Sequence, residues 1–154
     1  MTADARPSST VFSHIAAARA AGDPGRLLAA VPYAQFLGLD AALVDGELVT
    51  TMRYAPHLIG NPALPALHGG TLGALLESAA VFSLLWAAET AVLPKTITIT
   101  VDYLRSAGPR DTSAIGVVTR LGRRVAAVRV EAWQESRSQL VAAAHAHFLI
   151  KREA

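Results

Sequence analysis

The segment from Gly70 to Ala88 constrains the fold more than any other part of the chain, because Glu77 is its only charged residue. Its length and composition predict a helix that runs from Gly70 to about Ala91. A helix that is apolar on nearly all sides must be covered on nearly all sides, which places it inside the fold. The segment also approaches the length of a membrane span. Glu77 near its middle and the lack of a flanking basic cluster favour a buried helix and no membrane.

The rest of the chain is richer in strand signals than in helix signals. Two strands, at 40–44 and 47–53, flank an Asp45-Gly46 hairpin turn. Consecutive strands joined by short turns pair antiparallel, so we expect the later strands to form a meander. The predicted fold class is α+β, with a curved antiparallel sheet wrapped around the long helix. The later strands are predicted at 96–104, 112–120, 123–135 and 139–151.

The strand predicted at 96–104 alternates strictly between polar and apolar side chains. Successive side chains of a strand point to opposite faces of the sheet, so the two kinds are expected on opposite faces. The polar set is Thr96, Thr98, Thr100 and Asp102, and the apolar set is Ile97, Ile99, Val101 and Tyr103.

Short helices are predicted before the first strand. Residues 1–9 are expected to be a frayed tail, followed by helices at 10–21 and 26–31. The start of the chain has no apolar core behind a basic segment, so it does not resemble a secretory signal. Phe12, Ile15 and Ala16 are expected to lie on one face of the first helix.

Composition excludes several classes of protein. Hydrophobic residues make up 52% of the 154 residues and charged residues 17%, which is typical of one folded domain. We divide the chain into an N-terminal tail with short helices, 1–34, and a main domain, 35–154. The net charge is only +2, and the basic residues are spread out, so no nucleic-acid surface is expected. Without cysteine there is no thiol nucleophile or disulfide, which fits a cytoplasmic protein.

The His68-Gly69-Gly70 motif stands at the expected start of the long helix. Free N–H groups at a helix start attract negative charge, and glycines let a ligand approach them closely. Glu77 follows about two helical turns later. A carboxylate inside an apolar helix costs stability unless it has a charged or hydrogen-bonding partner or a functional role. Oxyanion donors near such a carboxylate suggest acyl transfer. The alternatives are a structural carboxylate that pairs with an arginine and a glycine pair that only shapes a tight turn.

Order, motif and spacing together resemble the hotdog-fold thioesterases, in particular the acyl-CoA thioesterases of the phenylacetate-pathway type. The resemblance covers about residues 35–150 and includes Glu77 nine positions after His68, the 101–105 segment and the 121–124 turn. It implies hydrolysis of an acyl-CoA thioester without any cofactor beyond the coenzyme A of the substrate. It also implies a homodimer or homotetramer with active sites between subunits.

The same resemblance implies roles for individual residues. Glu77 is expected to be the general base or the nucleophile, although many members have Asp there. The backbone N–H of Gly69, helped by Gly70, is expected to hold the oxyanion. His68 and Asn61 are expected to orient the thioester carbonyl or the attacking water.

Three further residues receive roles from the resemblance. Thr96 is expected to hydrogen-bond the attacking water, and Arg123 and Arg124 to face the phosphates of coenzyme A.

A non-catalytic protein that binds or senses acyl-CoA remains the alternative function. His145 and His147 have the spacing of two metal ligands, but no third ligand stands nearby in the sequence, so no metal is expected.

Overall fold

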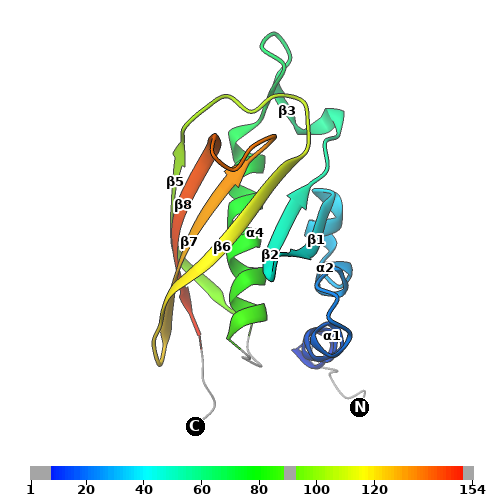
Figure 1. The fold of residues 1–154 in the computed structure, drawn as a ribbon, viewed down its shortest axis with the longest axis vertical. Helices are drawn as coiled ribbons and strands as arrows, with labels where there is room; N and C mark the ends of the chain where they lie inside the picture. Colours follow the sequence, from blue (N-terminus) through cyan, green and yellow to red (C-terminus); the bar gives the residue numbers. More distant parts are fainter. Residues whose placement is uncertain (1–7, 89–92, 151–154) are drawn as a thin grey trace, which may run out of the picture.

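A computed structural model of the chain describes residues 8–88 and 93–150 (Figure 1). The helices are α1 (Ser8–Ala21), α2 (Gly25–Ala29), α3 (Pro32–Phe36) and α4 (Gly69–Ala87), with a 3₁₀ turn, η1 (Pro56–Leu58). The strands are β1 (Leu39–Val44), β2 (Glu47–Met52), β3 (Ile59–Asn61), β4 (Ala66–Leu67), β5 (Lys95–Tyr103), β6 (Thr112–Leu121), β7 (Val125–Trp133) and β8 (Leu140–Leu149).

The main sheet curves around α4, which confirms the predicted α+β hotdog architecture (Figure 1). Six antiparallel strands follow the order β1-β2-β6-β7-β8-β5, and β3 and β4 form a separate small hairpin. Residues 1–7 of the expected tail, the helix end near Ala91 and the last predicted strand residue, Lys151, lie outside the described residues. The predicted extent of the tail, 1–9, was wrong at its end, because α1 already begins at Ser8. Within them, α4 ends at Ala87 with Ala88 as its C-cap.

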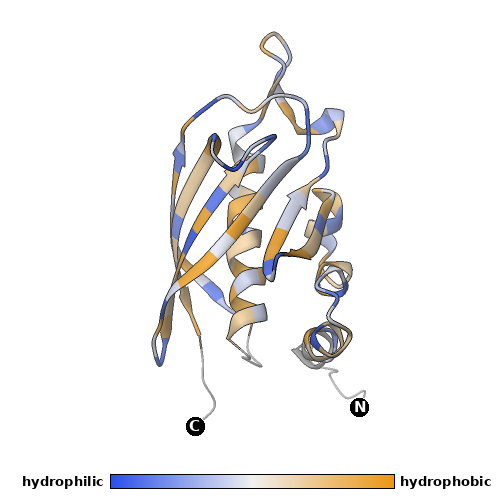
Figure 2. Ribbon diagram, viewed as in Figure 1, coloured by the Kyte–Doolittle hydropathy of each residue, from blue (hydrophilic) through white to orange (hydrophobic). Residues whose placement is uncertain are grey.

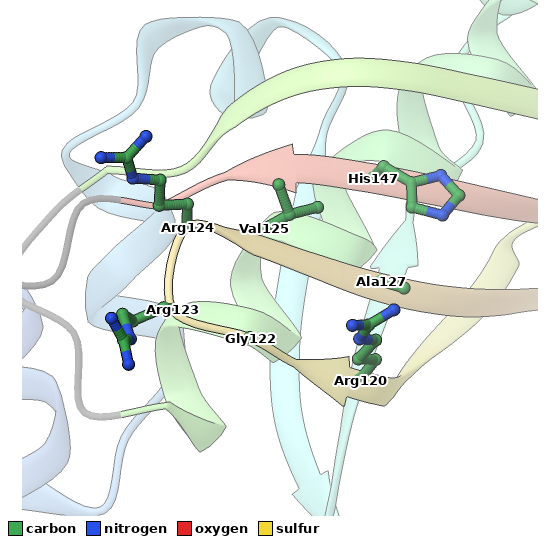
Figure 3. A pocket seen from close by; sticks show the side chains of 7 residues that line it. All are labelled: Arg120, Gly122, Arg123, Arg124, Val125, Ala127 and His147. Carbon is green, nitrogen blue, oxygen red and sulfur yellow. The ribbon is translucent and has the colours of Figure 1, made fainter.

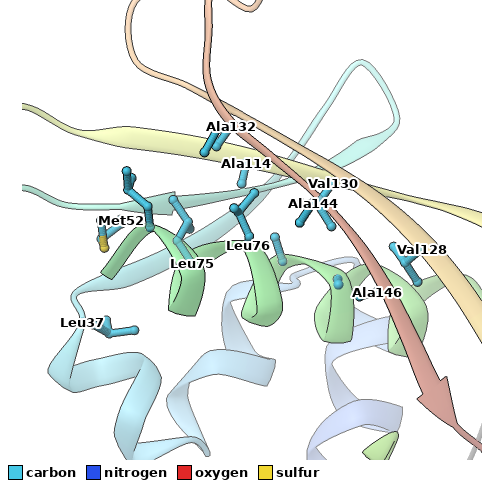
Figure 4. Packing of buried hydrophobic residues seen from close by; sticks show 14 of the residues in the cluster. Leu37, Met52, Leu75, Leu76, Ala114, Val128, Val130, Ala132, Ala144 and Ala146 are labelled. Atoms are coloured by element: carbon cyan, nitrogen blue, oxygen red, sulfur yellow. The ribbon is translucent and has the colours of Figure 1, made fainter. Parts of the chain in front are cut away.

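The main core lies between α4 and the concave face of the sheet (Figure 4). Leu75 and Leu76 are fully buried there, against strand residues such as Val130. Gly116 on β6 allows the close approach of α4, since a Cβ at this position would lie 2.9 Å from Ser83 Oγ and 3.1 Å from the Ala79 carbonyl oxygen. Helix and strand are therefore held at a distance that only glycine permits at this contact.

One stripe of α4 is not fully covered, contrary to the expectation that the helix is wrapped on nearly all sides. Ala74, Glu77, Ser78 and Val81 are each only partly buried. Their three- and four-residue spacing puts them on one face of the helix. By length and composition α4 could span a membrane, but half of it is buried inside the fold, which accounts for its apolarity. Its hydropathy is visible in Figure 2.

The N-terminal helices pack against the C-terminal half of α4 and against the hairpin formed by β1 and β2. A second apolar cluster joins Ile15 and Leu27 to Phe82 and Leu85 of α4. Ala16 of α1 is exposed, whereas Ile15 and Ala18 are buried. The side chain of Phe12 is outside the described residues.

The second predicted helix, 26–31, corresponds to α2, and a further short helix follows it. α2 ends at Ala29, and a new helix, α3, begins at Pro32. Proline is well suited to the first position of a helix, because its ring fixes φ and its missing N–H would have no partner there. The sequence analysis predicted no helix at 32–36.

The predicted meander was wrong in one respect, because β5 does not pair with β6. It pairs with β8 at the edge of the sheet, and β6 lies between β2 and β7. The 104–111 connection therefore passes the end of the β7–β8 hairpin, as Figure 1 shows. Gln134 holds it there: its amide nitrogen donates to the Gly108 carbonyl (2.9 Å), and its oxygen accepts from the Gly108 N–H (3.1 Å).

A small charge network joins the end of β2 to the start of β6. Arg53 pairs with Asp111 (2.9 Å) and Asp40 (3.1 Å), and the Tyr54 N–H donates to Asp111 (2.7 Å). The hydrogen bond from Tyr54 and that from Arg53 lower the pKa of Asp111 below its usual value. The charged form of Asp111 therefore stabilises the fold above its unfolded-state pKa, and this is lost as the pH falls through the lower pKa of the folded state.

Asp111→Asn is expected to lower the free energy of unfolding near neutral pH by no more than about 1 kcal/mol, because the pair is exposed to solvent. Asn keeps an acceptor for the Tyr54 N–H but removes the charge and the oxygen that accepts from Arg53. Urea unfolding of both proteins across a pH series measures the effect. The difference from wild type should shrink in acid, below about pH 4, and a difference that stays constant there would contradict the electrostatic explanation.

Candidate active site

Glu77 and Thr96 are in direct contact. The Thr96 hydroxyl donates a hydrogen bond of 2.6 Å to Glu77 Oε1. In the register of β5 against β8, Thr96 lies opposite Phe148 and Thr98 opposite His147, so Ile97 is an extra residue, a β-bulge. Phe148 is fully buried on the face toward α4, and residues opposite each other share a face. The bulge therefore turns Thr96 toward the helix.

This bulge corrects the prediction of strict alternation along 96–104. Thr96 shares the inner face with Ile99 and Val101, which pack against the core, and not with Thr98. Ile97 is 52% exposed. A one-residue insertion changes the face of every residue on one side of it, and the side-chain pattern alone does not reveal it.

Glu77 has no cationic partner among the described residues. Every ion pair in 8–88 and 93–150 involves other carboxylates, and the hydrogen bond from Thr96 is the contact that orients this one. The side chain is partly buried in the incompletely covered stripe of α4. The alternative in which Glu77 pairs with an arginine therefore has no support in the described part of the chain.

The start of α4 is held in place by two side chains. His68 is the N-cap, and its Nδ1 accepts a hydrogen bond of 2.8 Å from the Gly70 N–H. A neutral ring that accepts at Nδ1 carries its proton on Nε2, which is then available as a donor. The Tyr103 hydroxyl donates to the Gly69 carbonyl oxygen (2.9 Å). The strand pattern predicts Tyr103 only as part of an apolar face and gives no sign of this contact.

The two glycines of the motif differ in their free N–H groups. The Gly70 N–H is used by His68, whereas the Gly69 N–H finds no acceptor within the part of the chain that the structure describes. Gly69 is the first residue of α4, where the N–H groups have no partner inside the helix and the helix dipole favours negative charge. One donor, that of Gly69, is therefore open to a ligand.

Gly69 and Glu77 do not meet within one chain. They are eight residues apart on α4, which separates them by about 12 Å along the helix axis. A single thioester group cannot touch both at that distance. One chain therefore presents two half-sites, one with the free N–H and one with the carboxylate.

The hydrogen bond of the Asn61 side chain is made with neither half-site. Its side-chain oxygen accepts from the Ala63 N–H (3.0 Å), which closes a local turn in the exposed β3–β4 hairpin. Gly60 beside it approaches His68 so closely that a Cβ would lie 2.8 Å from the His68 Cα. The hairpin thus supports the start of α4, while the Asn61 side chain serves its own turn.

Arg123 and Arg124 line a second region, at the turn between β6 and β7 (Figure 3). Here a cavity of about 660 Å³ is also bordered by Arg120 and His147, and it shares no lining residue with the surroundings of Glu77. Arg120 and His147 flank Ala127 in neighbouring strands. Their common position follows from the strand register, which the sequence analysis did not predict.

His147 contacts a threonine side chain and the arginine-lined cavity in this structure. Its Nδ1 lies 3.2 Å from the Thr98 hydroxyl, and it borders the arginine-lined cavity. Within 8–88 and 93–150 no group of three or more side chains suited to a metal ion occurs.

A largely apolar cavity of about 350 Å³, which we call the helix cavity, lies beside Glu77. Its walls come from α1, α2, α3, α4 and the residues just before and within β5, including Thr96. Pockets for small molecules are typically apolar with a few well-placed polar groups. The helix cavity has this composition, with the Glu77–Thr96 pair as part of its wall.

The chain belongs to the thioesterase superfamily, whose sequence pattern matches residues 64–141. A protein of known structure from Chromobacterium violaceum is 36% identical; the alignment covers 92% of this chain and 99% of that chain, with a TM-score of 0.75. A phenylacetic acid degradation-related protein from Ralstonia eutropha is 27% identical over 82% of this chain and 98% of its own, with a TM-score of 0.71. A mutant of the phenylacetic acid degradation protein PaaI from Thermus thermophilus is 30% identical over 77% and 97%, with a TM-score of 0.61.

These similarities confirm the resemblance to thioesterases of the phenylacetate-pathway type. A comparison with curated proteins found no match.

Proposed function

We propose that the protein is an acyl-CoA thioesterase, which hydrolyses a thioester to a carboxylic acid and free coenzyme A. The observation that carries the proposal is Glu77: a carboxylate without a cationic partner in the described chain, oriented by Thr96 and bordering an apolar cavity. A structural carboxylate would be expected to pair with a base or to cap a backbone turn. Membership of the thioesterase superfamily supports the same chemistry.

In the proposed reaction the thioester carbonyl oxygen lies against the Gly69 N–H at the positive end of α4. This donor stabilises the negative charge that develops on the oxygen during attack. Glu77 either takes a proton from the attacking water or attacks the acyl carbon itself and forms an anhydride that water then hydrolyses. The bond between the acyl carbon and sulfur breaks, and coenzyme A leaves as a thiolate. No further cofactor takes part.

The separation of Gly69 and Glu77 within one chain supports a site built from two copies. We therefore propose a homodimer, or a tetramer made of dimers, in which the carboxylate of one copy faces the helix start of the other. β5 is an edge strand that no described element continues, and an unpaired edge is a template for a second strand. An interface along β5 brings the second copy next to Thr96. In that copy His68, Gly70 and Asn61 would border the carbonyl or the water.

The phosphates of coenzyme A are proposed to bind at the arginine-lined cavity. Guanidinium groups match phosphate oxygens in charge and geometry. Arg123 and Arg124 supply two such groups, and Arg120 supplies a third from the adjacent strand end. We propose a cytoplasmic location, where acyl-CoA substrates occur. A chain without cysteine has no disulfide that this reducing compartment would break.

Thiol release from acyl-CoA tests the proposal directly. The purified protein is incubated with acetyl-, butanoyl-, octanoyl-, dodecanoyl-, hexadecanoyl- and phenylacetyl-CoA in the presence of a reagent for free thiols. Release well above the rate without protein supports the enzyme. Tight binding of these compounds without any thiol release would instead identify a non-catalytic acyl-CoA-binding protein.

Thr96→Val is expected to reduce kcat by about tenfold or more, because a hydrogen bond to a charged group is worth about 1.5–3 kcal/mol. Valine keeps the branched shape that the bulged strand accommodates, so the fold should persist. Thr96→Ser, which retains a hydroxyl group, is the matched control and should lose much less. Equal activity of the valine and serine variants would show that the hydroxyl does not act on Glu77.

A further inference from the structure

The lining of the helix cavity extends along α4. On the helix side its wall is formed by one stripe of residues that begins at Ala74 and ends at Leu85, with Glu77 near its N-terminal end. Residues at this spacing lie on one face of a helix. An acyl group whose carbonyl lies at Glu77 can extend its tail along this stripe toward Leu85.

The opposite wall comes from the N-terminal helices. Ile15 of α1 and Leu27 of α2 border the cavity, and each is only 4% exposed. Val31, between α2 and α3, also lines it. Because these side chains are anchored in the second apolar cluster, the wall is already formed in the free chain.

The size of the cavity limits what fits. Glu77 and Leu85 are about 12 Å apart along the helix axis, a distance that an extended alkyl chain, advancing about 1.3 Å per bond, spans with about nine bonds. The volume of about 350 Å³ holds about a dozen groups of methylene size, at about 30 Å³ each. The length and the volume of the cavity therefore indicate acyl chains of similar size. A phenylacetyl group would fill only about half of the length.

We propose that the N-terminal helices build an acyl-tail pocket against α4 and that the protein selects straight acyl chains of about eight to twelve carbons. This inference rests on the proposed thioesterase function. Each methylene that enters the pocket leaves water, which should raise kcat/KM about threefold to fourfold until the pocket is full. Longer chains have to leave part of the tail outside or bend it, so the gain stops.

The test is kcat/KM across straight acyl-CoA substrates from butanoyl to hexadecanoyl, with phenylacetyl-CoA alongside. The expected profile rises steeply with chain length and stops rising between octanoyl and dodecanoyl. A flat profile, an optimum at butanoyl or hexadecanoyl, or a preference for phenylacetyl-CoA would overturn the pocket assignment.

A matched pair of variants locates the pocket. Ala30 lines the helix cavity, whereas its neighbour Ala29 is exposed on α2 and does not. Ala30→Phe should move the optimum to chains shorter by about four carbons, because the ring occupies space for several methylenes. Ala29→Phe introduces the same ring outside the cavity and should leave the profile as in the wild type. Identical profiles for the two variants would contradict the assignment.

Binding of an S-decyl thioether of coenzyme A, which cannot be hydrolysed, separates this inference from the proposed function. Its affinity is measured by calorimetry for the wild type and both variants. Binding of this thioether that is weakened by Ala30→Phe and not by Ala29→Phe, with no thiol release from any acyl-CoA, would overturn the hydrolase and retain the pocket. Thiol release that does not depend on chain length would retain the hydrolase and overturn the pocket.

Discussion

Glu77→Gln is expected to reduce thioester hydrolysis by at least ~10²-fold, which is the usual range for the loss of a general base. Glutamine has nearly the same shape and still accepts the hydrogen bond from Thr96, but it neither takes a proton from water nor attacks an acyl carbon. Since Glu77 makes no ion pair in the described part of the chain, removing its charge should leave folding and assembly intact. The measurement is kcat for thiol release, with oligomer size by light scattering.

Two comparisons sharpen this experiment. Glu135→Gln removes an equal charge from an exposed turn, where the carboxylate pairs with Arg110, and should retain full activity. Glu77→Asp keeps the carboxylate but withdraws it by one methylene, so an intermediate loss is expected. Undiminished hydrolysis by a pure Glu77→Gln sample would exclude Glu77 as the catalytic group.

Gly69→Pro is the second change with a large expected effect, because it removes the one free N–H at the start of α4. Proline suits the first position of a helix, and the extended conformation of His68 (φ −64°, ψ 131°) is the one that a following proline prefers. The backbone should therefore accept the ring. Loss of an oxyanion donor typically lowers kcat by ~10²–10³.

Gly69→Ala provides the matched control. Its Cβ would meet the Tyr103 ring at 3.3 Å, so alanine introduces the same close contact as proline but keeps the N–H. Tyr103 is 57% exposed and has room to adjust. Activity lost equally in both variants would assign the effect to crowding of Tyr103 and not to the missing donor.

The same two variants test whether each active site is formed by residues of two chains. In a mixture of Glu77→Gln and Gly69→Pro chains, a mixed dimer has one site with both defects and one with neither. Random exchange of equal amounts should restore about a quarter of the wild-type activity. A site contained in one chain would gain nothing from mixing.

The sequence predicted the parts of the fold that depend on composition. The apolar segment around Glu77 had to be buried, and the alternating strands had to cover it, so the helix and the curved antiparallel sheet were predicted correctly. The neighbours of β5 were not, because a meander and a strand that moves to the far edge have the same local patterns. Pairing with β8 depends on the whole sheet, which no single segment encodes.

The candidate site was predictable as a set of groups but not as a set of contacts. The motif at 68–70 suggested two oxyanion donors, yet the His68 ring uses the Gly70 N–H. Sequence patterns name the groups that are able to bind a ligand and do not show which are already occupied. Arg120 was missed for a related reason, since only the strand register brings it beside Ala127 and His147.

The extra residue at Ile97 has a consequence for how such a chain can change. The contact between Thr96 and Glu77 depends on the pairing of Thr96, and not of Ile97, with Phe148. Pairing of the same segment without a bulge would set Ile97 opposite Phe148 and turn the Thr96 hydroxyl to the outer surface, whereas deletion of Ile97 would leave Thr96 opposite Phe148 on the inner face. A shift of register at the start of β5 would therefore separate the acid from its hydroxyl partner without any change of sequence.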